Sequence, residues 1–312
     1  MTDFRPTFVV IGILLSMVAI VMTLPAIVDA IDGHGDWQVF VIAASMTLFV
    51  GVAMALTSRT PRTKLSTRQA FLMTTISWLA MTLFASIPFM FSVLNLSFTD
   101  AFFEAMSGIT TTGSTIITGL DAAPRGILLW RALLQWLGGI GIIVTAIAVF
   151  PMLRVGGMQL FRMESSDQSE KALPRAAQVA AAIGVIYLAL TSICATAYWM
   201  AGMSGFEAVA HAMTTIATGG FSTSDLSLSH FNSISVEIIA IAGMLVGALP
   251  FILFLKMLQG DGRVLFRDSQ VQWFISIVVL AVLAAAGWLW YVNGMEPASA
   301  LRFASFNIVS II

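Results

Sequence analysis

The sequence predicts an all-α protein that crosses a membrane several times. Hydrophobic residues make up 58% of the 312 positions and charged residues only 10%, and the mean hydropathy is +0.94. This composition excludes an ordinary soluble domain. The apolar residues also gather into runs of about 20 residues, the length that an α-helix needs to cross the hydrocarbon core of a bilayer.

Seven apolar runs are expected to form spanning helices. The first could instead be a secretory signal peptide, but it is longer than a typical signal sequence core and no small-residue cleavage site follows it. Ser66 and Thr67 can cap the third span, and the turn at 121–124 precedes the fourth. The expected spans are 8–28, 39–56, 69–94, 126–153, 174–203, 233–258 and 270–293.

A polar stretch follows the third expected span and then recurs. Residues 100–115 read DAFFEAMSGITTTGST, and the pattern returns 107 positions later, at 207–222, as EAVAHAMTTIATGGFS. Both copies start with an acid and place a glycine at the same point, Gly113 and Gly220. A period near 100 residues is too long for a solenoid and fits a duplicated membrane module.

Each copy predicts a short helix followed by a non-helical segment rich in threonine and glycine. The helix is too short to span, and its negative C-terminal end can point toward a cation. Carbonyl groups of the following segment can replace the water shell of that cation. Gly113 and Gly220 permit backbone angles that a Cβ would oppose. Ordinary loops also contain threonine–glycine turns, but two copies at one offset favour re-entrant, ion-selective loops.

Several polar residues near these loops allow two interpretations. Asp100 and Glu207 are expected to be dipole partners or caps of their helices, with direct ion binding as the alternative. His211 is expected to be packed rather than to sense protons. Arg131 could pair with an acid such as Asp121 or Glu104, although snorkelling toward the surface is the simpler interpretation. Close helix packing is expected at the glycines 138, 139, 141, 243 and 247.

Four stretches together resemble the Trk/Ktr/HKT superfamily of potassium transporters, most closely the TrkH/TrkG membrane subunits of bacterial Trk systems. They are GITTTGST, WRALLQWLGGIGIIV, PMLRVGGMQLFRMES and HAMTTIATGGFST, in this order, and the resemblance covers essentially the whole chain. It implies potassium-channel-like units, each made of an outer helix, a pore helix, a filter and an inner helix, arranged four around one pore. The implied potassium filter residues are Thr111, Thr112, Gly113, Thr218, Gly219 and Gly220, flanked by Thr110, Ser114, Ala217 and Phe221.

The resemblance also implies how the chain is divided. An N-terminal pair of transmembrane helices (1–57) precedes the first pore unit (69–153). A cytoplasmic connector (154–173) leads to the second pore unit (174–259). Residues 270–312 match the start of a third unit and end before a filter glycine is reached, so the chain is expected to be truncated within that unit.

The charges predict an orientation. Twelve of the fifteen lysines and arginines fall on one side if the spans alternate and the loops re-enter, so this side is expected to be cytoplasmic, with the N-terminus. The other side carries mostly acids, among them Asp29, Asp32 and Asp36. They could concentrate cations near a pore or simply occupy external loops.

No catalytic motif is visible, and a non-enzyme without a cofactor is expected. The resemblance implies potassium uptake across the bacterial inner membrane by the pore-forming subunit of a Trk-type system. It also implies a homodimer in the lipid bilayer, bound by a nucleotide-binding regulatory subunit of the TrkA kind, with potassium as the transported ligand and no role for nucleic acid. The alternatives are a sodium-dependent Ktr/HKT-like transporter and a non-conducting fragment that serves as a structural or assembly partner.

Overall fold

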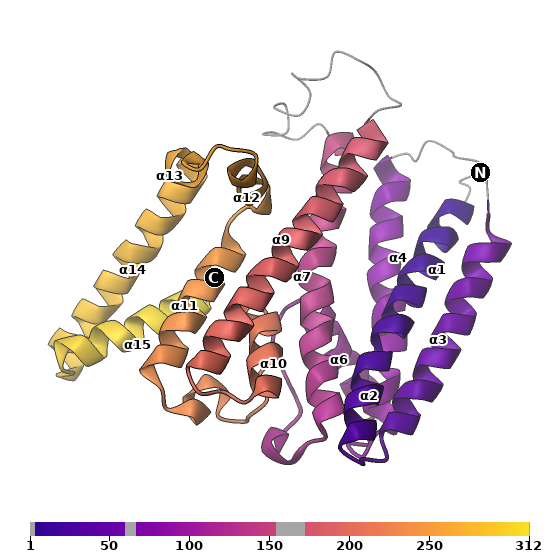
Figure 1. The fold of residues 1–312 in the computed structure, drawn as a ribbon, viewed down its shortest axis with the longest axis horizontal. Coiled ribbons are helices and arrows are strands. Elements are labelled where there is room, and N and C mark those ends of the chain that lie inside the picture. Colours follow the sequence, from indigo (N-terminus) through magenta and orange to yellow (C-terminus); the bar gives the residue numbers. More distant parts are fainter. Residues whose placement is uncertain (1–3, 60–66, 154–171, 312) are drawn as a thin grey trace. The chain divides into compact units, whose positions relative to one another are not determined.

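Apolar helices joined by short loops make up the part of the chain that the structure describes, residues 4–59, 67–153 and 172–311, in a computed structural model (Figure 1). The chain divides into two compact units. Unit 1 consists of Met1–Ala176 together with Phe221–Asp225, and unit 2 consists of Ala177–Gly220 and Leu226–Ile312. The short piece 221–225 therefore belongs to unit 1 although its neighbours in sequence belong to unit 2.

In unit 1, the first helix packs along the third and the fourth, and the last long helix packs against the short helix before it. Close approach of two helix backbones requires glycine at positions 12 and 51, because a Cβ on Gly12 would lie 2.5 Å from the carbonyl oxygen of Gly51. Small residues of this kind let membrane helices pack tightly. The helices are α1 (Arg5–Val21), α2 (Thr23–Ile31), α3 (Trp37–Thr57), α4 (Thr67–Ala85), α5 (Ile87–Phe91), α6 (Phe98–Ile109) and α7 (Arg125–Leu153), with a 3-10 turn, η1, at Leu120–Ala122.

Unit 2 contains most of one long helix, a short helix and a bent helix pair, followed by a second long helix and a final shorter one. The short helix packs on the first part of the bent pair, and so does the final helix. The elements are α9 (Ala172–Met200), α10 (Gly205–Ile216), η2 (Ser227–Phe231), α11 (Ile234–Ala248), α12 (Phe251–Leu258), α13 (Val264–Arg267), α14 (Ser269–Asn293) and α15 (Pro297–Ser310).

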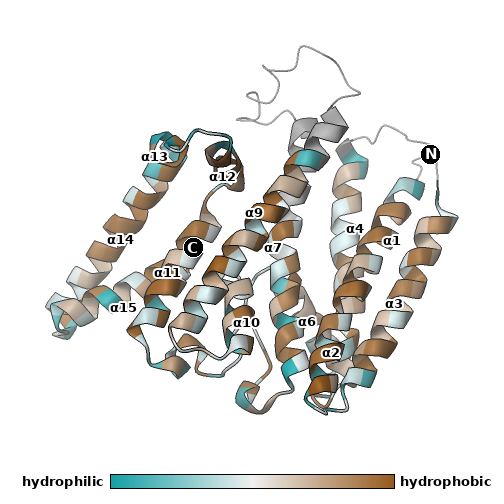
Figure 2. Ribbon diagram, viewed as in Figure 1, coloured by the Kyte–Doolittle hydropathy of each residue, from teal (hydrophilic) through white to brown (hydrophobic). Residues whose placement is uncertain are grey.

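Hydrophobic residues cover the long helices, and hydrophilic residues gather near their ends and in the connecting loops (Figure 2). Five described helical segments are long and apolar enough to cross a membrane, and a sixth is added if the bent pair α11–α12 is one span. The 29-residue helix α7 coincides with the expected span at 126–153. The all-helical, multi-span prediction is confirmed for the described residues.

The span expected at 233–258 is not one straight helix. The structure breaks it into α11 and α12, which are bent by 88° with respect to each other. Pro250 explains the break, because proline lacks a backbone N–H and disfavours helical backbone in the residue before it. Leu249 accordingly adopts an extended conformation, with φ −76° and ψ 149°.

Two other expected spans also consist of two helices each. The span expected at 8–28 is formed by α1 and α2, and the span expected at 69–94 by α4 and α5. In both cases the combined segment is still long and apolar enough to cross a membrane. The expected connector at 154–173 lies outside the described residues up to position 171, as does most of the basic segment at 59–68.

Candidate functional site

The two short helices α6 and α10 begin in the same way. Ser97 precedes α6 and its hydroxyl accepts a hydrogen bond from the backbone N–H of Asp100. Ser204 precedes α10 and forms a reciprocal capping box with Glu207. Both acids therefore lie in the first helical turn, where a carboxylate is stabilised by the helix dipole. The first-turn position of both acids agrees with the predicted role of dipole partners or caps, but only the Glu207 carboxylate caps its helix, since the hydroxyl of Ser97 is the cap of α6.

The two helices also end in the same way. The N–H of Thr111 donates to Gly108 O and that of Thr112 donates to Ser107 O, at 3.0 and 2.9 Å. The same two bonds close α10, from Thr218 to Thr215 O and from Gly219 to Thr214 O, at 3.0 and 2.8 Å. This pair of bonds is the Schellman arrangement, which satisfies the last carbonyl groups of a helix.

Left-handed backbone follows each helix at two positions. Thr111 and Thr218 have φ of 57° and 49°, and two residues later Gly113 and Gly220 have φ of 81° and 83°. Glycine is the usual residue at the first of these positions, since a β-branched residue is rarely found at positive φ. A non-glycine residue in this conformation costs roughly 1–2 kcal/mol. Backbone strain of this kind concentrates at functional sites.

The remaining predicted site residues differ in exposure between the two loops. In the first loop the hydroxyl groups of Thr110 and Thr112 lie 2.7 Å apart, and both residues are exposed, as is Ser114. In the second loop Ala217, Gly219 and Phe221 are buried. The first loop thus presents a run of exposed hydroxyl groups on non-helical backbone, whereas the second is packed more tightly.

The last residue of each short helix packs against a glycine of the α-helix that follows the loop. A Cβ on Gly138 of α7 would lie 2.0 Å from Ile109 O, and a Cβ on Gly247 of α11 would lie 2.6 Å from Ile216 O. Any larger residue would push these helix ends away. Close packing at these two glycines was predicted from the sequence and is confirmed.

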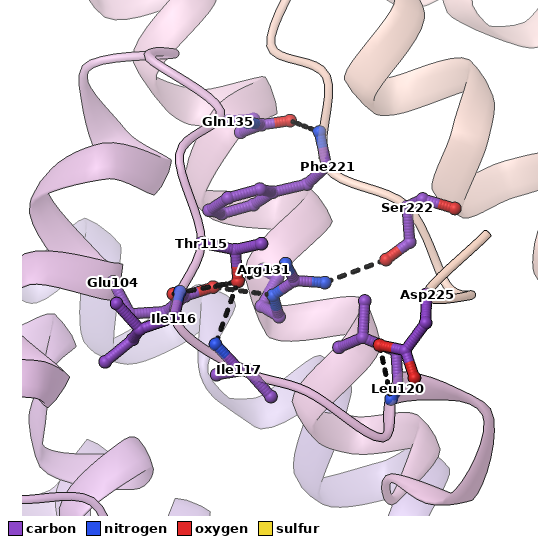
Figure 3. Close-up of polar contacts among 10 residues, drawn as sticks. All are labelled: Glu104, Thr115, Ile116, Ile117, Leu120, Arg131, Gln135, Phe221, Ser222 and Asp225. Carbon is purple, nitrogen blue, oxygen red and sulfur yellow. Dashed lines mark hydrogen bonds and ion pairs between the residues drawn. The ribbon is translucent and has the colours of Figure 1, made fainter. Parts of the chain in front are cut away.

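A fully buried ion pair lies behind the first loop (Figure 3). The Nε atom of Arg131 on α7 lies 2.9 Å from Oε1 of Glu104 on α6, and the two side chains are 1% and 0% exposed. The carboxylate also accepts hydrogen bonds from the Thr115 hydroxyl and from the Ile116 N–H. Breaking a buried pair of this kind typically costs about 3–5 kcal/mol, because it leaves an uncompensated charge.

The same arginine reaches the segment 221–225 of unit 1. Its guanidinium donates to the carbonyl oxygen of Ser222 at 2.8 Å and lies over the Phe221 ring, 4.1 Å from the centroid. One helical turn further along α7, the Gln135 side chain accepts from the Phe221 N–H at 3.0 Å. These contacts, seen together in Figure 3, hold the residues that directly follow Gly220 against α7.

Further hydrogen bonds hold Asp225, at the other end of the segment 221–225. The Asp225 carboxylate accepts hydrogen bonds from the N–H groups of Gly119 and Leu120, at 2.9 and 3.2 Å. The N–H of Asp225 in turn donates to the Asp121 carboxylate at 3.4 Å. Residues 221–225 are therefore fixed at both ends to the part of the chain that follows the first loop.

The structure corrects the interpretation of Arg131. Snorkelling toward the surface is wrong, since the guanidinium is buried and pairs with Glu104, the other possibility that the sequence raised. Gln135 was not singled out from the sequence at all. An uncharged polar residue within the apolar run ALLQWLGG was the available signal.

The predicted external acids make structural hydrogen bonds. A carboxylate oxygen of Asp29 accepts from the Gly126 N–H at 2.6 Å, at the start of α7. The carboxylate of Asp36 accepts from the Val93 N–H, in the loop between α5 and α6. The acidic loop is thereby held at the same end of unit 1 as the starts of α6 and α7.

Spanning helices together with two short, non-spanning helices that end in strained threonine–glycine segments define a polytopic helical membrane protein of the transport class. A family model described as "TrkH: Cation transport protein" matches residues 36–293. The chain belongs to this family, and the resemblance noted in the sequence is confirmed.

Named relatives support the same assignment. The chain is 40% identical over 313 residues to the "Trk system potassium uptake protein TrkI" of Halomonas elongata, covering 99% of this chain and 63% of that protein. It is 37% identical to TrkH of Escherichia coli over 313 residues, covering 99% of this chain and 65% of the relative. The crystal structure of the potassium transporter TrkH from Vibrio parahaemolyticus matches with a TM-score of 0.91 at 36% identity, covering 99% of this chain and 64% of that one. The chain thus spans about two thirds of the length of these relatives.

Proposed function

We propose that this chain supplies pore-lining loops of a potassium-uptake protein in the bacterial inner membrane. The backbone carbonyl groups of Thr111, Thr112 and Gly113 and of Thr218, Gly219 and Gly220 take the place of water around a potassium ion. The flanking residues Thr110, Ser114, Ala217 and Phe221 support these two filter segments. The arrangement of the chain in repeated pore units belongs to the same proposal.

The observation that carries the proposal is the matched geometry of the two loops. Two helices of 12 residues each begin with an acid in the first turn and end in the same pair of Schellman bonds. A threonine and a glycine with positive φ then follow each of them. Uncharged carbonyl groups on a non-helical segment can coordinate a cation at membrane depth, provided that protein or a water-filled cavity surrounds the segment.

Relatives named as potassium uptake proteins of Trk systems support the ion and the direction of transport. By the same resemblance we propose a homodimer bound on its cytoplasmic face by a nucleotide-binding regulatory subunit of the TrkA kind. The N-terminus is proposed to be cytoplasmic, which follows from the distribution of lysine and arginine.

Growth of a potassium-uptake-deficient bacterium at low potassium tests the function. The complete product of the gene that encodes this chain should restore growth and should take up potassium in preference to sodium. Gly113→Asp and Gly220→Asp should each abolish this preference, because the new side chain opposes the positive φ and brings a charge to the carbonyl groups. Gly33→Asp is the matched control, since Gly33 also has positive φ, 73°, with open space around it, but lies in the acidic loop.

The outcome also separates the alternatives. Unchanged potassium preference in both filter variants would refute the filter assignment. Uptake that requires external sodium would favour a sodium-dependent Ktr/HKT-like transporter. A gene product that reaches the membrane without restoring growth or uptake would favour a structural or assembly role.

A further inference from the structure

Arg131 contacts equivalent points of the two loops. In the repeat of 107 positions, Thr115 of the first loop corresponds to Ser222 of the second. The guanidinium donates to the Thr115 hydroxyl at 3.1 Å and to the Ser222 carbonyl oxygen at 2.8 Å. Each contact lies two residues beyond the glycine of its loop, at the point where the threonine–glycine segment ends.

The second repeat cannot supply such a pair of its own. The residue that corresponds to Glu104 is His211, which is buried and whose Nδ1 lies 2.9 Å from Glu207 O. Gly138 of α7 and Gly247 of α11, which contact the ends of α6 and α10, align α7 with α11 at an offset of 109. At that offset Ala240, a fully buried residue, corresponds to Arg131.

We infer that Arg131 is a positioning residue that sets the ion selectivity of both filter segments, with Glu104 holding its charge in place. The inference rests on the proposed function and extends it. A carbonyl filter discriminates between ions by the number and spacing of its oxygens, so each segment must be fixed at both ends. The Schellman bonds fix the start of each segment, and Arg131 fixes the end of each.

The chemistry of the guanidinium suits this task. Its planar fork can donate in several directions at once, whereas the ammonium group of lysine is a compact point charge. Here the guanidinium donates hydrogen bonds to Glu104, Thr115 and Ser222 and also lies over the Phe221 ring. Gln135 adds a hydrogen bond to the second segment alone, through the Phe221 N–H. Changes at Arg131 should thus affect both segments, and a change at Gln135 only one.

The test measures selectivity and stability separately in the complete gene product. Arg131→Lys, Thr115→Val and Gln135→Leu are compared with Arg125→Gln, a matched control because Arg125 lies on the same helix, is exposed and pairs with Asp32 at 3.5 Å. The readouts are the potassium-to-sodium permeability ratio, the apparent affinity for potassium, and the amount and melting temperature of the purified protein.

Arg131→Lys is expected to lower the permeability ratio about tenfold, the change that corresponds to the loss of one charged hydrogen bond. Thr115→Val should lower the ratio less, since it disturbs the first segment only. Gln135→Leu should also lower it less, since it disturbs the second segment only. Arg125→Gln should leave the ratio unchanged. The double variant Thr115→Val/Gln135→Leu should approach the effect of Arg131→Lys.

A purely structural role would give a different result. The melting temperature and amount of Arg131→Lys would fall, while the protein that remains would keep the permeability ratio of the wild type, and the inference would be overturned. If Arg131→Lys does not accumulate, an unchanged ratio in both Thr115→Val and Gln135→Leu overturns it equally. Failure of the wild type to take up potassium would instead count against the proposed function.

Discussion

The carbonyl oxygen of Ile109 lies so close to the backbone of Gly138 that a Cβ on this glycine would be only 2.0 Å from it. Ile109 is the last residue of α6, and Gly138 lies near the middle of α7. The position of the first threonine–glycine segment is therefore set by the absence of a side chain on the neighbouring long helix. Gly247 and Ile216 form the corresponding contact in unit 2.

The first prediction concerns this contact. Gly138→Ala should displace the end of α6 and lower the free energy of unfolding by about 1–3 kcal/mol, the usual cost of overpacking. Gly141→Ala is the control on the same helix, because its Cβ would meet nothing nearer than the Trp78 ring at 3.6 Å. Thermal unfolding of the purified protein in detergent checks both. Equal melting temperatures for the two variants would contradict the packing argument.

The second prediction separates strain from function at Thr111. Thr111→Gly should raise the free energy of unfolding by about 1 kcal/mol, since glycine adopts positive φ without the steric cost. Potassium preference should fall in the same variant, because the segment loses stiffness. Thr111→Ala keeps a Cβ and should not be stabilised. Chemical or thermal unfolding gives the first quantity and flux measurements give the second; a Thr111→Gly variant no more stable than Thr111→Ala would show that the strain is absent.

The third prediction concerns pH. Burial lowers the pKa of His211 below its ordinary value of 6.5, so the imidazole is neutral at pH 7. A lowered pKa in the folded state means that the contribution of His211 to stability is complete above pH 6.5 and is lost as the pH falls below it. His211→Gln should therefore leave the potassium uptake profile unchanged between pH 7 and 8. A change in that profile would identify His211 as a proton sensor after all.

The fourth prediction concerns orientation. On a Cys194→Ala background, which removes the buried native thiol, Asp121→Cys should react with a membrane-impermeant maleimide added outside intact cells. Asp261→Cys should react only after the membrane is opened, because it lies in the segment predicted to be cytoplasmic. Labelling of position 261 from outside would reverse the proposed topology.

The sequence was sufficient for features that depend on local pattern. The short helices, the acids in their first turns and the left-handed glycines 113 and 220 follow from periodicity and residue type, and the structure has them as expected. The break at Pro250 was also visible in the sequence, but the apolar run around it favoured a single span. A proline inside an apolar run can be tolerated as a kink, so its presence alone does not predict a bend of 88°.

Features that depend on long-range packing were not predictable in the same way. Glu104 and Arg131 are 27 positions apart on different helices. Taken singly, an acid or an arginine near the end of an apolar run can equally well lie in a loop or extend its side chain toward the surface. The hydrogen bond from Arg131 to Ser222 joins residues 91 positions apart. Its acceptor is a backbone carbonyl, which every residue has, so the residue type at position 222 could not indicate it.

Residues 221–225, which pack with unit 1 while the chain on either side of them packs with unit 2, have a consequence for gene exchange. Residues 1–176 and 177–312 are not interchangeable modules, because the segment 221–225 depends on hydrogen-bond partners in residues 1–176, through Phe221, Ser222 and Asp225. A recombination event that replaced residues 1–176 with those of a distant relative would have to preserve the positions equivalent to Gln135, Arg131 and Asp121. Hybrids between relatives should accordingly be viable when residues 119–135 and 221–225 descend from the same parent.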